Sequence, residues 1–333
     1  MRIELSVTSV SWIPSAAIAG TTRIPFELSV TKYDDPPPEQ WQDLDEVVGP
    51  DGARFANHLS AWIEVEDGKI VSYGQGGGGR LSSTLVRLGG MRVLVQAVGY
   101  PDLRPEPEVG PDFVRFTQTA GGRPGVPSPR LVKGAPFMKT QGPTVWTTLA
   151  LTLYADGSAG HELVGASPFP RHWIYDANGS LAGKSAVIDF KTWYRTSTLA
   201  RSPWHGRQNA ILAAEAETPL ERRLSLAVMR GGGQQPKPTR VKAGSTILAE
   251  GEAGHEIVLL LDGMVQVEVG GAAVAELGPG AVLGERAALE QGRRTATIRA
   301  LTDCRIVSYP AVALPAEDLR ELATFHRRED QPG

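Results

Sequence analysis

Cysteine is almost absent from this sequence, because Cys304 is the only one among 333 residues. A disulfide within the chain is therefore excluded, and cysteine pairs are not available to build a metal site. Cys304 lies in a segment that alternates like a strand. That context predicts a small buried core residue rather than a nucleophile.

Long apolar runs are also missing. No stretch approaches the length of a membrane span, and the alternating residues 1–7 lack the continuous apolar run of a signal peptide. Lys and Arg (34) nearly balance Asp and Glu (37), which leaves a net charge of −3. Bulk electrostatics therefore give no reason to expect nucleic acid as the main partner. We expect a cytoplasmic protein with no membrane or DNA partner.

Recognised metal-ligand spacings and the P-loop motif are missing as well. The pairs His161-Glu162 and Arg171-His172 do not have a metal-ligand spacing, so we predict no metal site. The glycine run at 74–80 lacks the Lys-Ser/Thr of a P-loop and the strand–helix context of a dinucleotide fold. This run favours a flexible hairpin connection over a phosphate cradle.

Residues 1–217 are predicted to form a β-rich domain. Alternating or β-branched segments indicate strands, and pairs such as Asp67-Gly68 mark tight turns between them. The predicted strands are residues 3–10, 24–31, 61–66, 69–73, 81–88, 91–98, 113–117, 145–154 and 186–190. Residues 39–48 and 207–217 are predicted to be helical. The sequence does not identify what this domain does.

Aromatic and polar side chains are densest in the second half of that domain. They fill residues 167–176 and continue through Lys184, Asp189, Lys191, Trp193, Tyr194 and Arg195. A buried lysine beside a carboxylate could act as a base or nucleophile, so an active site would be sought here first. The alternative interpretation is a packed aromatic core with an ion-paired rim.

A hinge is predicted over residues 218–238. Thr218 can cap a helix, Pro219 fits its first turn, and Glu221 completes a capping-box spacing. The Gly- and Pro-rich residues 231–238 follow as a linker. The helix either relays a signal or closes the first domain, and the second domain is expected over residues 239–333.

Short strands separated by glycine turns indicate an antiparallel β-roll or jelly roll in that second domain. Residues 241–248 are predicted to form a strand, a turn and a second strand, and further strands are predicted at residues 257–261, 264–269, 297–300 and 305–309. Asp262-Gly263 is a hairpin turn signal. The chain as a whole is therefore expected to be mainly β with a few helices.

The segment from Gly284 to Ala300 carries the most specific chemistry. An ionised Glu285 only accepts hydrogen bonds, which suits a sugar hydroxyl, and the planar fork of Arg294 suits a phosphate. Residues 287–289 can form one helical turn with free N–H groups directed at the same anion. Gly284 lets backbone approach a ligand without a Cβ in the way.

This segment resembles the phosphate-binding cassette of cyclic nucleotide-binding domains, and the resemblance extends over about residues 238–315. It implies a β-roll with flanking helices that binds cAMP or cGMP, with Glu285 on the ribose 2′-hydroxyl and Arg294 on the cyclic phosphate. The implied ligand contacts are Gly284, Glu285, Arg286, Ala287, Arg294, Thr295 and Ala296. Two positions depart from the family pattern, which usually has an aromatic residue at Leu283 and an apolar one at Arg286.

The choice of base is only weakly indicated. In the family a hydroxyl at Thr295 can contact a syn guanine, but it can equally bond the phosphate, and bacterial-type relatives with a hydroxyl there resemble cAMP binders. We predict a small preference for cAMP over cGMP.

One amphipathic helix is predicted over residues 315–326, after which the chain ends. A DNA-reading head would have to follow here, so a DNA-binding regulator is disfavoured. Leu319, Leu322 or Phe325 could cap the base as a lid, or the helix could simply pack on the roll.

In the family, helices before the roll move when ligand binds. The resemblance therefore implies a non-enzymatic sensor whose ligand alters how the N-terminal domain binds a protein partner. The alternative is an enzyme in residues 1–217 that cyclic nucleotide regulates.

Overall fold

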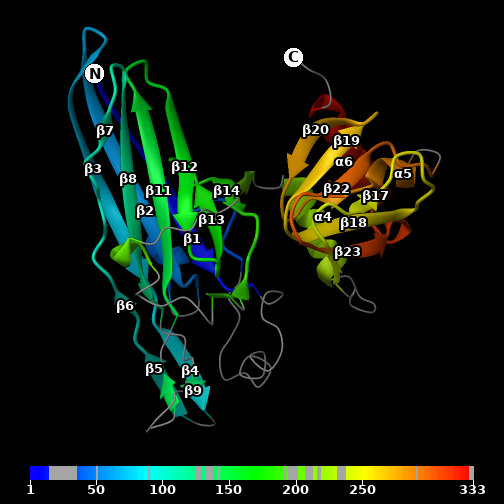
Figure 1. The fold of residues 1–333 in the computed structure, drawn as a ribbon, viewed down its shortest axis with the longest axis horizontal. Coiled ribbons are helices and arrows are strands. Elements are labelled where there is room, and N and C mark those ends of the chain that lie inside the picture. The colour runs from blue at the N-terminus through cyan, green and yellow to red at the C-terminus, as the bar shows by residue number, and fades with distance from the viewer. Residues whose placement is uncertain are drawn as a thin grey trace. The chain divides into compact units, whose positions relative to one another are not determined.

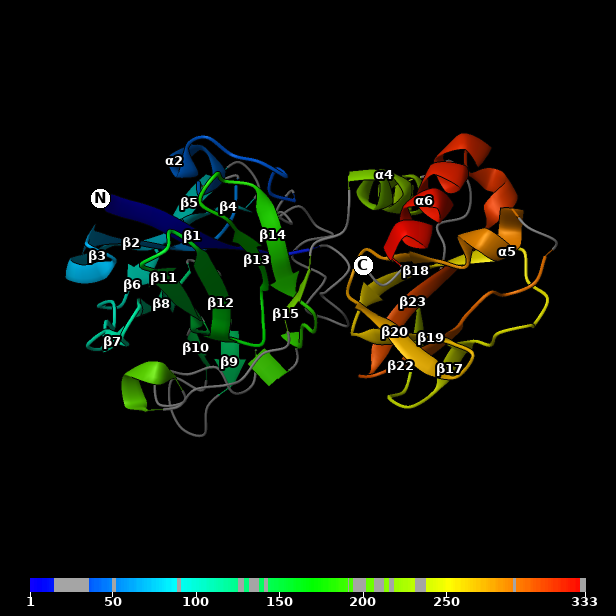
Figure 2. The same ribbon diagram turned by 90° about the horizontal axis from the view of Figure 1, so that it is seen from above.

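The computed structural model describes residues 1–14, 36–49, 52–88, 91–124, 129–131, 138–140, 143–190, 192–193, 202–206, 213–215, 219–230, 238–289 and 292–329. The chain divides into two compact units, Met1–Ile211 and Leu212–Gly333, which Figures 1 and 2 show from two directions.

The first unit contains two antiparallel sheets. One runs in the order β14-β13-β1-β2-β3, and the other runs in the order β12-β11-β8-β6, with β7 also paired to β8. The strands of the first sheet are β1 (Arg2–Trp12), β2 (Phe55–Glu66), β3 (Lys69–Leu81), β13 (Arg171–Tyr175) and β14 (Leu181–Ser185). Those of the second are β6 (Val98–Gly99), β7 (Glu108–Val109), β8 (Phe113–Arg123), β11 (Val145–Tyr154) and β12 (Ala159–Ala166).

Shorter elements complete this unit. Two hairpins pair β4 (Thr84–Leu88) with β5 (Met91–Val95) and β9 (Pro129–Leu131) with β10 (Met138–Thr140). The helical pieces include α2 (Leu44–Val47) and the 3₁₀ turn η4 (Pro203–His205), and Phe190, Thr192 and Trp193 are also helical.

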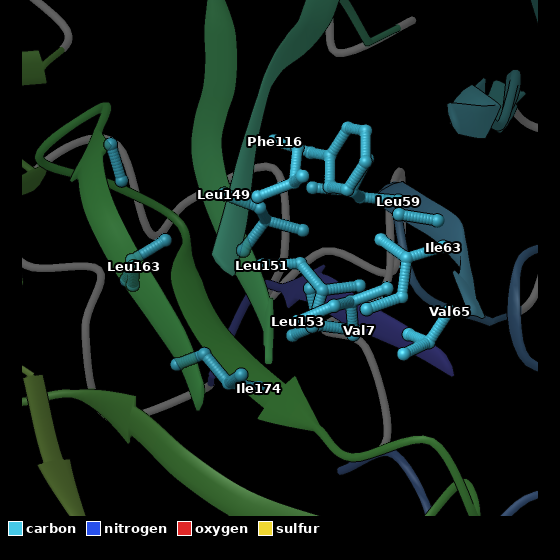
Figure 3. Packing of buried hydrophobic residues seen from close by; sticks show 13 residues of the cluster. Val7, Leu59, Ile63, Val65, Phe116, Leu149, Leu151, Leu153, Leu163 and Ile174 are labelled. Atoms are coloured by element: carbon cyan, nitrogen blue, oxygen red, sulfur yellow. The ribbon is translucent and has the colours of Figure 1, made fainter. Parts of the chain in front are cut away.

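The inward faces of the two sheets form the core of the first unit. Leu59 and Ile63 alternate with outward residues along β2, and they meet Phe116, Leu149 and Leu153 from the second sheet (Figure 3). Two sheets that bury their apolar faces against each other form a β-sandwich. Alternate side chains of a strand lie on the same face of its sheet, and this two-residue repeat therefore explains how each sheet presents one apolar face to the other.

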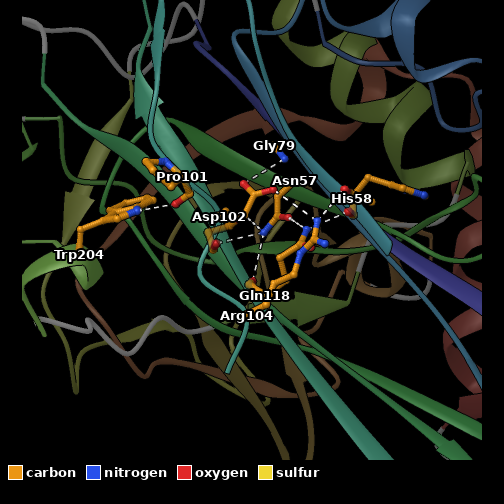
Figure 4. A network of polar contacts seen from close by, with 10 residues as sticks. Asn57, His58, Gly79, Pro101, Asp102, Arg104, Gln118 and Trp204 are labelled. Carbon is orange, nitrogen blue, oxygen red and sulfur yellow. Dashed lines mark hydrogen bonds and ion pairs between the residues drawn. The ribbon is translucent and has the colours of Figure 1, made fainter. Parts of the chain in front are cut away.

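A seam of buried polar side chains, Ser9, Asn57, Gln118 and Thr147, crosses the same interior. Gln118 Nε2 donates to Asn57 Oδ1 at 2.7 Å, and Asn57 Nδ2 donates to the Thr147 carbonyl at 3.1 Å. At the outer end, Arg104 Nε donates to Gln118 Oε1 at 2.8 Å (Figure 4). Since these groups satisfy one another, the seam links the two sheets in place of apolar contact.

The glycine run belongs to a strand, so the predicted flexible hairpin connection at 74–80 was wrong. Asp67-Gly68 makes the β2–β3 turn as expected, and β3 then continues through the glycines to Leu81. A Cβ on Gly79 would lie 2.9 Å from Ala120 Cβ in the second sheet. The missing side chains therefore let β3 lie close to β8.

Several other predicted elements differ from the structure. Residues 186–190 form no strand, because Ile188 and Phe190 turn into an aromatic cluster with Phe169 and Trp193. Residues 213–215 form strand β15 (Ala213–Glu215) rather than helix. The helix predicted over 39–48 shortens to α2, and the strand predicted over 81–88 divides between β3 and β4. The strand at 24–31, residues 207–212 and the linker at 231–237 lie outside the described residues.

The second unit is a β-roll with helices at both ends. Its two sheets run in the orders β16-β23-β18-β21 and β17-β22-β19-β20. The strands are β16 (Thr239–Val241), β17 (Thr246–Leu248), β18 (Glu256–Asp262), β19 (Val265–Val269), β20 (Ala272–Leu277), β21 (Val282–Leu283), β22 (Thr297–Ala300) and β23 (Cys304–Pro310). The helices are α4 (Pro219–Arg230), α5 (Glu285–Leu289), η5 (Ala311–Ala313) and α6 (Ala316–Glu329). The chain is thus mainly β with a few helices.

The turn at Asp262-Gly263 does not make a hairpin, which corrects the sequence prediction. It joins β18 to β19, and these strands pair in different sheets. The turn therefore carries the chain across the roll. Cys304 lies beside it, buried in the core as predicted, where burial raises the pKa of its thiol.

Helix α4 packs within the second unit. Leu220, Leu224 and Val228 recur on one face and join Leu319 and Leu322 of α6 in one apolar cluster, the helical cluster. Leu319 is 3% exposed and Leu322 is wholly buried. These two leucines are therefore core residues and not an apolar lid. The Phe325 side chain lies outside the described residues.

Candidate ligand-binding site

The seven residues implied by the cassette resemblance lie together in the structure. Gly284, Glu285, Arg286, Ala287, Arg294, Thr295 and Ala296 all line one pocket of the second unit. The loop before α5 and the loop before β22 bring the two halves of this set together. The cassette resemblance had grouped these residues, and the fold places them around a common space.

The rest of the pocket is an apolar wall supplied by the roll. Its residues are Leu248, Val267, Val269, Val274, Ala275, Leu277, Leu283 and Ile298. Sequence reasoning missed this wall, although the alternation in 264–269 was the available signal, because alternate residues of a strand share one face. Strand β20, which supplies Val274, Ala275 and Leu277, was not predicted.

Glycine at 284 is required by the local backbone and by its neighbour. Its φ is +86°, a left-handed conformation that side-chain-bearing residues rarely adopt, and it comes directly before α5. A Cβ here would also fall on Arg294 Nη1. The glycine therefore makes room for the arginine, a reason that the sequence alone did not provide.

Arg294 is held in place by backbone carbonyls. Its Nη1 donates to Glu256 O at 2.8 Å and to Gly284 O at 3.1 Å, and the residue is 8% exposed. Burial lowers the pKa of the guanidinium from its ordinary value, while the carboxylates of Glu256, Glu285 and Glu252 oppose that change. Arginine still carries its charge in such surroundings. The pocket therefore presents a fixed cation.

Glu285 supplies an acceptor on the same pocket wall. It is the first residue of α5, and it is 4% exposed. A carboxylate, a guanidinium and an apolar wall around one space suit a ligand with an anion, a hydroxyl group and a flat apolar part.

The aromatic and polar segment of the first unit forms a packed interior. His172 is wholly buried, with Nδ1 2.6 Å from Ser11 Oγ and Nε2 2.8 Å from the Ser167 carbonyl. Lys184 is also buried, at 2% exposure, and Phe169 packs on Trp193 with ring centroids 5.0 Å apart. This geometry favours the interpretation of this segment as a core over an active site.

The described parts of the chain contain no group of three His, Cys, Asp or Glu side chains placed to hold a metal ion. Glu162 instead pairs with Arg115 at 2.8 Å. No helix among the described residues is long and apolar enough to cross a membrane.

The family model of the cyclic nucleotide-binding domain matches residues 238–323, a range that contains every residue of the pocket. Residues 238–323 are a cyclic nucleotide-binding domain. The loop–α5–loop segment described above lies within this matched range.

Each individual relative matches only part of this chain, and this chain spans about a tenth of the length of the curated relatives that it matches. The cGMP-dependent protein kinase egl-4 of Caenorhabditis briggsae is 37% identical over 67 residues, which cover 20% of this chain and 9% of the kinase. The solved structure of cAMP-bound PfPKA-R is 21% identical, covers 33% of this chain and 46% of that chain, and has a TM-score of 0.28. The Catabolite Activator Protein of Thermus thermophilus is 26% identical over 34% of this chain and 56% of that chain, with a TM-score of 0.27.

Proposed function

We propose that this chain is a cyclic-nucleotide sensor in which ligand in the pocket of the second unit alters what the first unit binds. The observation that carries the proposal is the convergence of Glu285, Arg294 and the apolar wall on one pocket. Residues 1–217 act as the output domain in this proposal, and residues 218–238 act as the hinge. A cytoplasmic location, expected from the sequence, fits such a role.

The ligand would use three parts of the pocket. Its cyclic phosphate would pair with Arg294, whose fork gives two directed hydrogen bonds to phosphate oxygens. Its ribose 2′-hydroxyl would donate to Glu285, and its base would lie on the apolar wall from β19 and β20. Gly284, Ala287 and Ala296 would pack around the phosphate and sugar.

We propose cAMP as the preferred ligand by a small margin. Among the described residues that line the pocket, the polar or charged ones are Glu285, Arg286, Arg294 and Thr295. The wall therefore offers little to distinguish two purines, and one or two hydrogen bonds from Thr295 set a limit of about 2 kcal/mol on the preference.

A route for coupling runs through the helical cluster. Ala288 and Leu289 of α5 pack against the same apolar cluster as Leu224 of α4 and Leu322 of α6. Arg223 of α4 also pairs with Asp318 of α6 at 2.9 Å. A ligand that shifts α5 would therefore bias α4, which lies directly before the linker to the roll.

Tryptophan fluorescence can test the coupling in the intact chain, because all seven tryptophans lie in Met1–Ile211. Urea unfolding followed by this signal reports the first unit alone. Saturating cAMP should change its unfolding free energy by about 1–3 kcal/mol, the usual size of a coupling energy. The Arg294→Ala variant, which removes the phosphate partner, should show no such change. If calorimetry detects cAMP binding but cAMP does not change the fluorescence unfolding curve, the coupling is refuted. The assignment of the ligand would still stand.

A further inference from the structure

Gly254 lies in the loop between β17 and β18, next to the guanidinium of Arg294. Three backbone hydrogen bonds of 2.8 Å fasten this loop to the loop that carries Arg294. They run from Gly254 N to Gly292 O, from Gly251 N to Arg294 O, and from Arg294 N to Glu252 O. The backbone at Gly254 is therefore fixed relative to the arginine.

A side chain at position 254 would occupy the place of the guanidinium. A Cβ there would lie 2.5 Å from Arg294 Nη2, 2.6 Å from Nε and 2.7 Å from Cζ, all shorter than the 3.0 Å below which real Cβ contacts essentially never fall. Gly254 does not have the positive φ that Gly284 has, so alanine would cost it no backbone strain. The steric clash would therefore have to be relieved by movement of the Arg294 side chain.

The guanidinium cannot move away from a Cβ at 254 without disturbing the hydrogen bonds that hold it. Its Nη1 is bound to the carbonyls of Glu256 and Gly284, and its surroundings are buried. Ordinary contact with a Cβ at 254 begins at 3.4 Å, so the nearest guanidinium atom, at 2.5 Å, would have to shift by about 0.9 Å. That exceeds the tolerance of about 0.5 Å within which a binding group must be held. Such a shift would break or lengthen the two carbonyl hydrogen bonds that aim the fork.

We propose that Gly254 is a positioning residue for ligand binding. It leaves the space that the Arg294 guanidinium occupies, and it thereby sets the affinity for an anionic ligand. Gly254 itself is not among the residues that line the pocket. This inference rests on the proposed function of the pocket. The proposed role distinguishes Gly254 from Gly284, because the positive φ of Gly284 would by itself make a substitution there disruptive.

A double-mutant cycle on the full chain tests the inference. Calorimetric titration with cAMP would compare wild type, Gly254→Ala, Arg294→Ala and the double variant. Gly254→Ala should weaken binding on the order of tenfold in the wild-type background, as expected for a displaced binding group. It should leave the residual affinity unchanged in the Arg294→Ala background, because no guanidinium remains to be displaced.

Gly292→Ala is the matched control. Gly292 lies in the same pair of loops with φ +70°, and a Cβ there would meet the His255 ring rather than Arg294. Its effect should be equal in both backgrounds. The fitted number of sites reports the folded fraction separately from affinity, so a partly unfolded variant still gives a result.

Equal losses from Gly254→Ala in the two backgrounds, or no loss in the wild type, would overturn the role of Gly254 while the pocket assignment stood. Failure of the folded wild type to bind either cAMP or cGMP would overturn the proposed function itself, and the role of Gly254 with it.

Discussion

Acid should destabilise the first unit through His172. The Ser167 carbonyl only accepts hydrogen bonds, so Nε2 of His172 carries the proton, and Nδ1 accepts from the Ser11 hydroxyl. Protonation of Nδ1 would place a charge in the wholly buried core and remove that acceptor. Burial, with a smaller contribution from the Arg171 charge, accordingly lowers the pKa of His172 from 6.5 to about 4.

The size of the effect follows from proton linkage. The unfolded chain binds a proton at His172 below pH 6.5, whereas the folded chain binds it only near pH 4. The stability due to the neutral His172 is therefore complete above pH 6.5 and is lost progressively as the pH falls toward 4. Between pH 7 and pH 5 the loss from this residue is roughly 2 kcal/mol.

Urea unfolding of the full chain, followed by tryptophan fluorescence at pH 7 and pH 5, measures this loss. Burial and the charge of Arg80 also lower the pKa of His58, so His58 adds to the wild-type change in the same direction. The difference between wild type and His172→Gln isolates the contribution of His172. His161→Gln, which changes an exposed histidine of β12, is the control and should keep the wild-type loss. If His172→Gln loses as much stability as wild type between these pH values, the linkage argument is wrong.

Three further predictions concern the pocket. A 2′-deoxy cyclic nucleotide should bind wild type more weakly than cAMP but should show little further loss in Glu285→Gln, and additive losses in a calorimetric cycle would exclude the ribose contact. Competition titrations should find cAMP preferred over cGMP by at most about 2 kcal/mol, whereas a strong cGMP preference that vanishes in Thr295→Ala would assign Thr295 to guanine. Arg286 lines the pocket beside a cation that Glu252, Glu256 and Glu285 surround, so Arg286→Met should weaken cAMP binding and reduce its salt dependence. Arg320→Met, which removes an exposed charge on α6, is the matched control, and an equal salt response in both variants would refute a role for Arg286.

The elements that could be predicted from sequence are those whose cause is local. Strand β11 has the bounds that its own residues predicted, Val145–Tyr154, and the Gly284–Ala296 set could be grouped because the cassette resemblance places those residues in one short segment. The elements that could not be predicted have distant causes. Gly79 is small because Ala120 lies against it, and the Asp262-Gly263 turn changes sheets because of the partners that β18 and β19 find.

The same limit applies to the site. Arg294 was predicted from its own cassette, but the glycine that gives it space lies about forty residues earlier, at 254. The apolar wall could not be assembled without knowing that β19 and β20 pair. Sequence could also not decide between a lid and a packed helix for residues 315–326. The burial of Leu322 against α4 decides for packing.

The central claim is that Arg294 holds the anion of a cyclic nucleotide in the second unit, and calorimetric titration of the full chain with cAMP tests it most directly. Wild type should bind one cAMP per chain. Arg294→Ala should lose on the order of 2–5 kcal/mol of binding free energy, because it removes the buried partner of the phosphate. Arg294→Lys, which keeps the charge without the fork, should lie between them. Wild-type affinity in a folded Arg294→Ala variant would contradict the account.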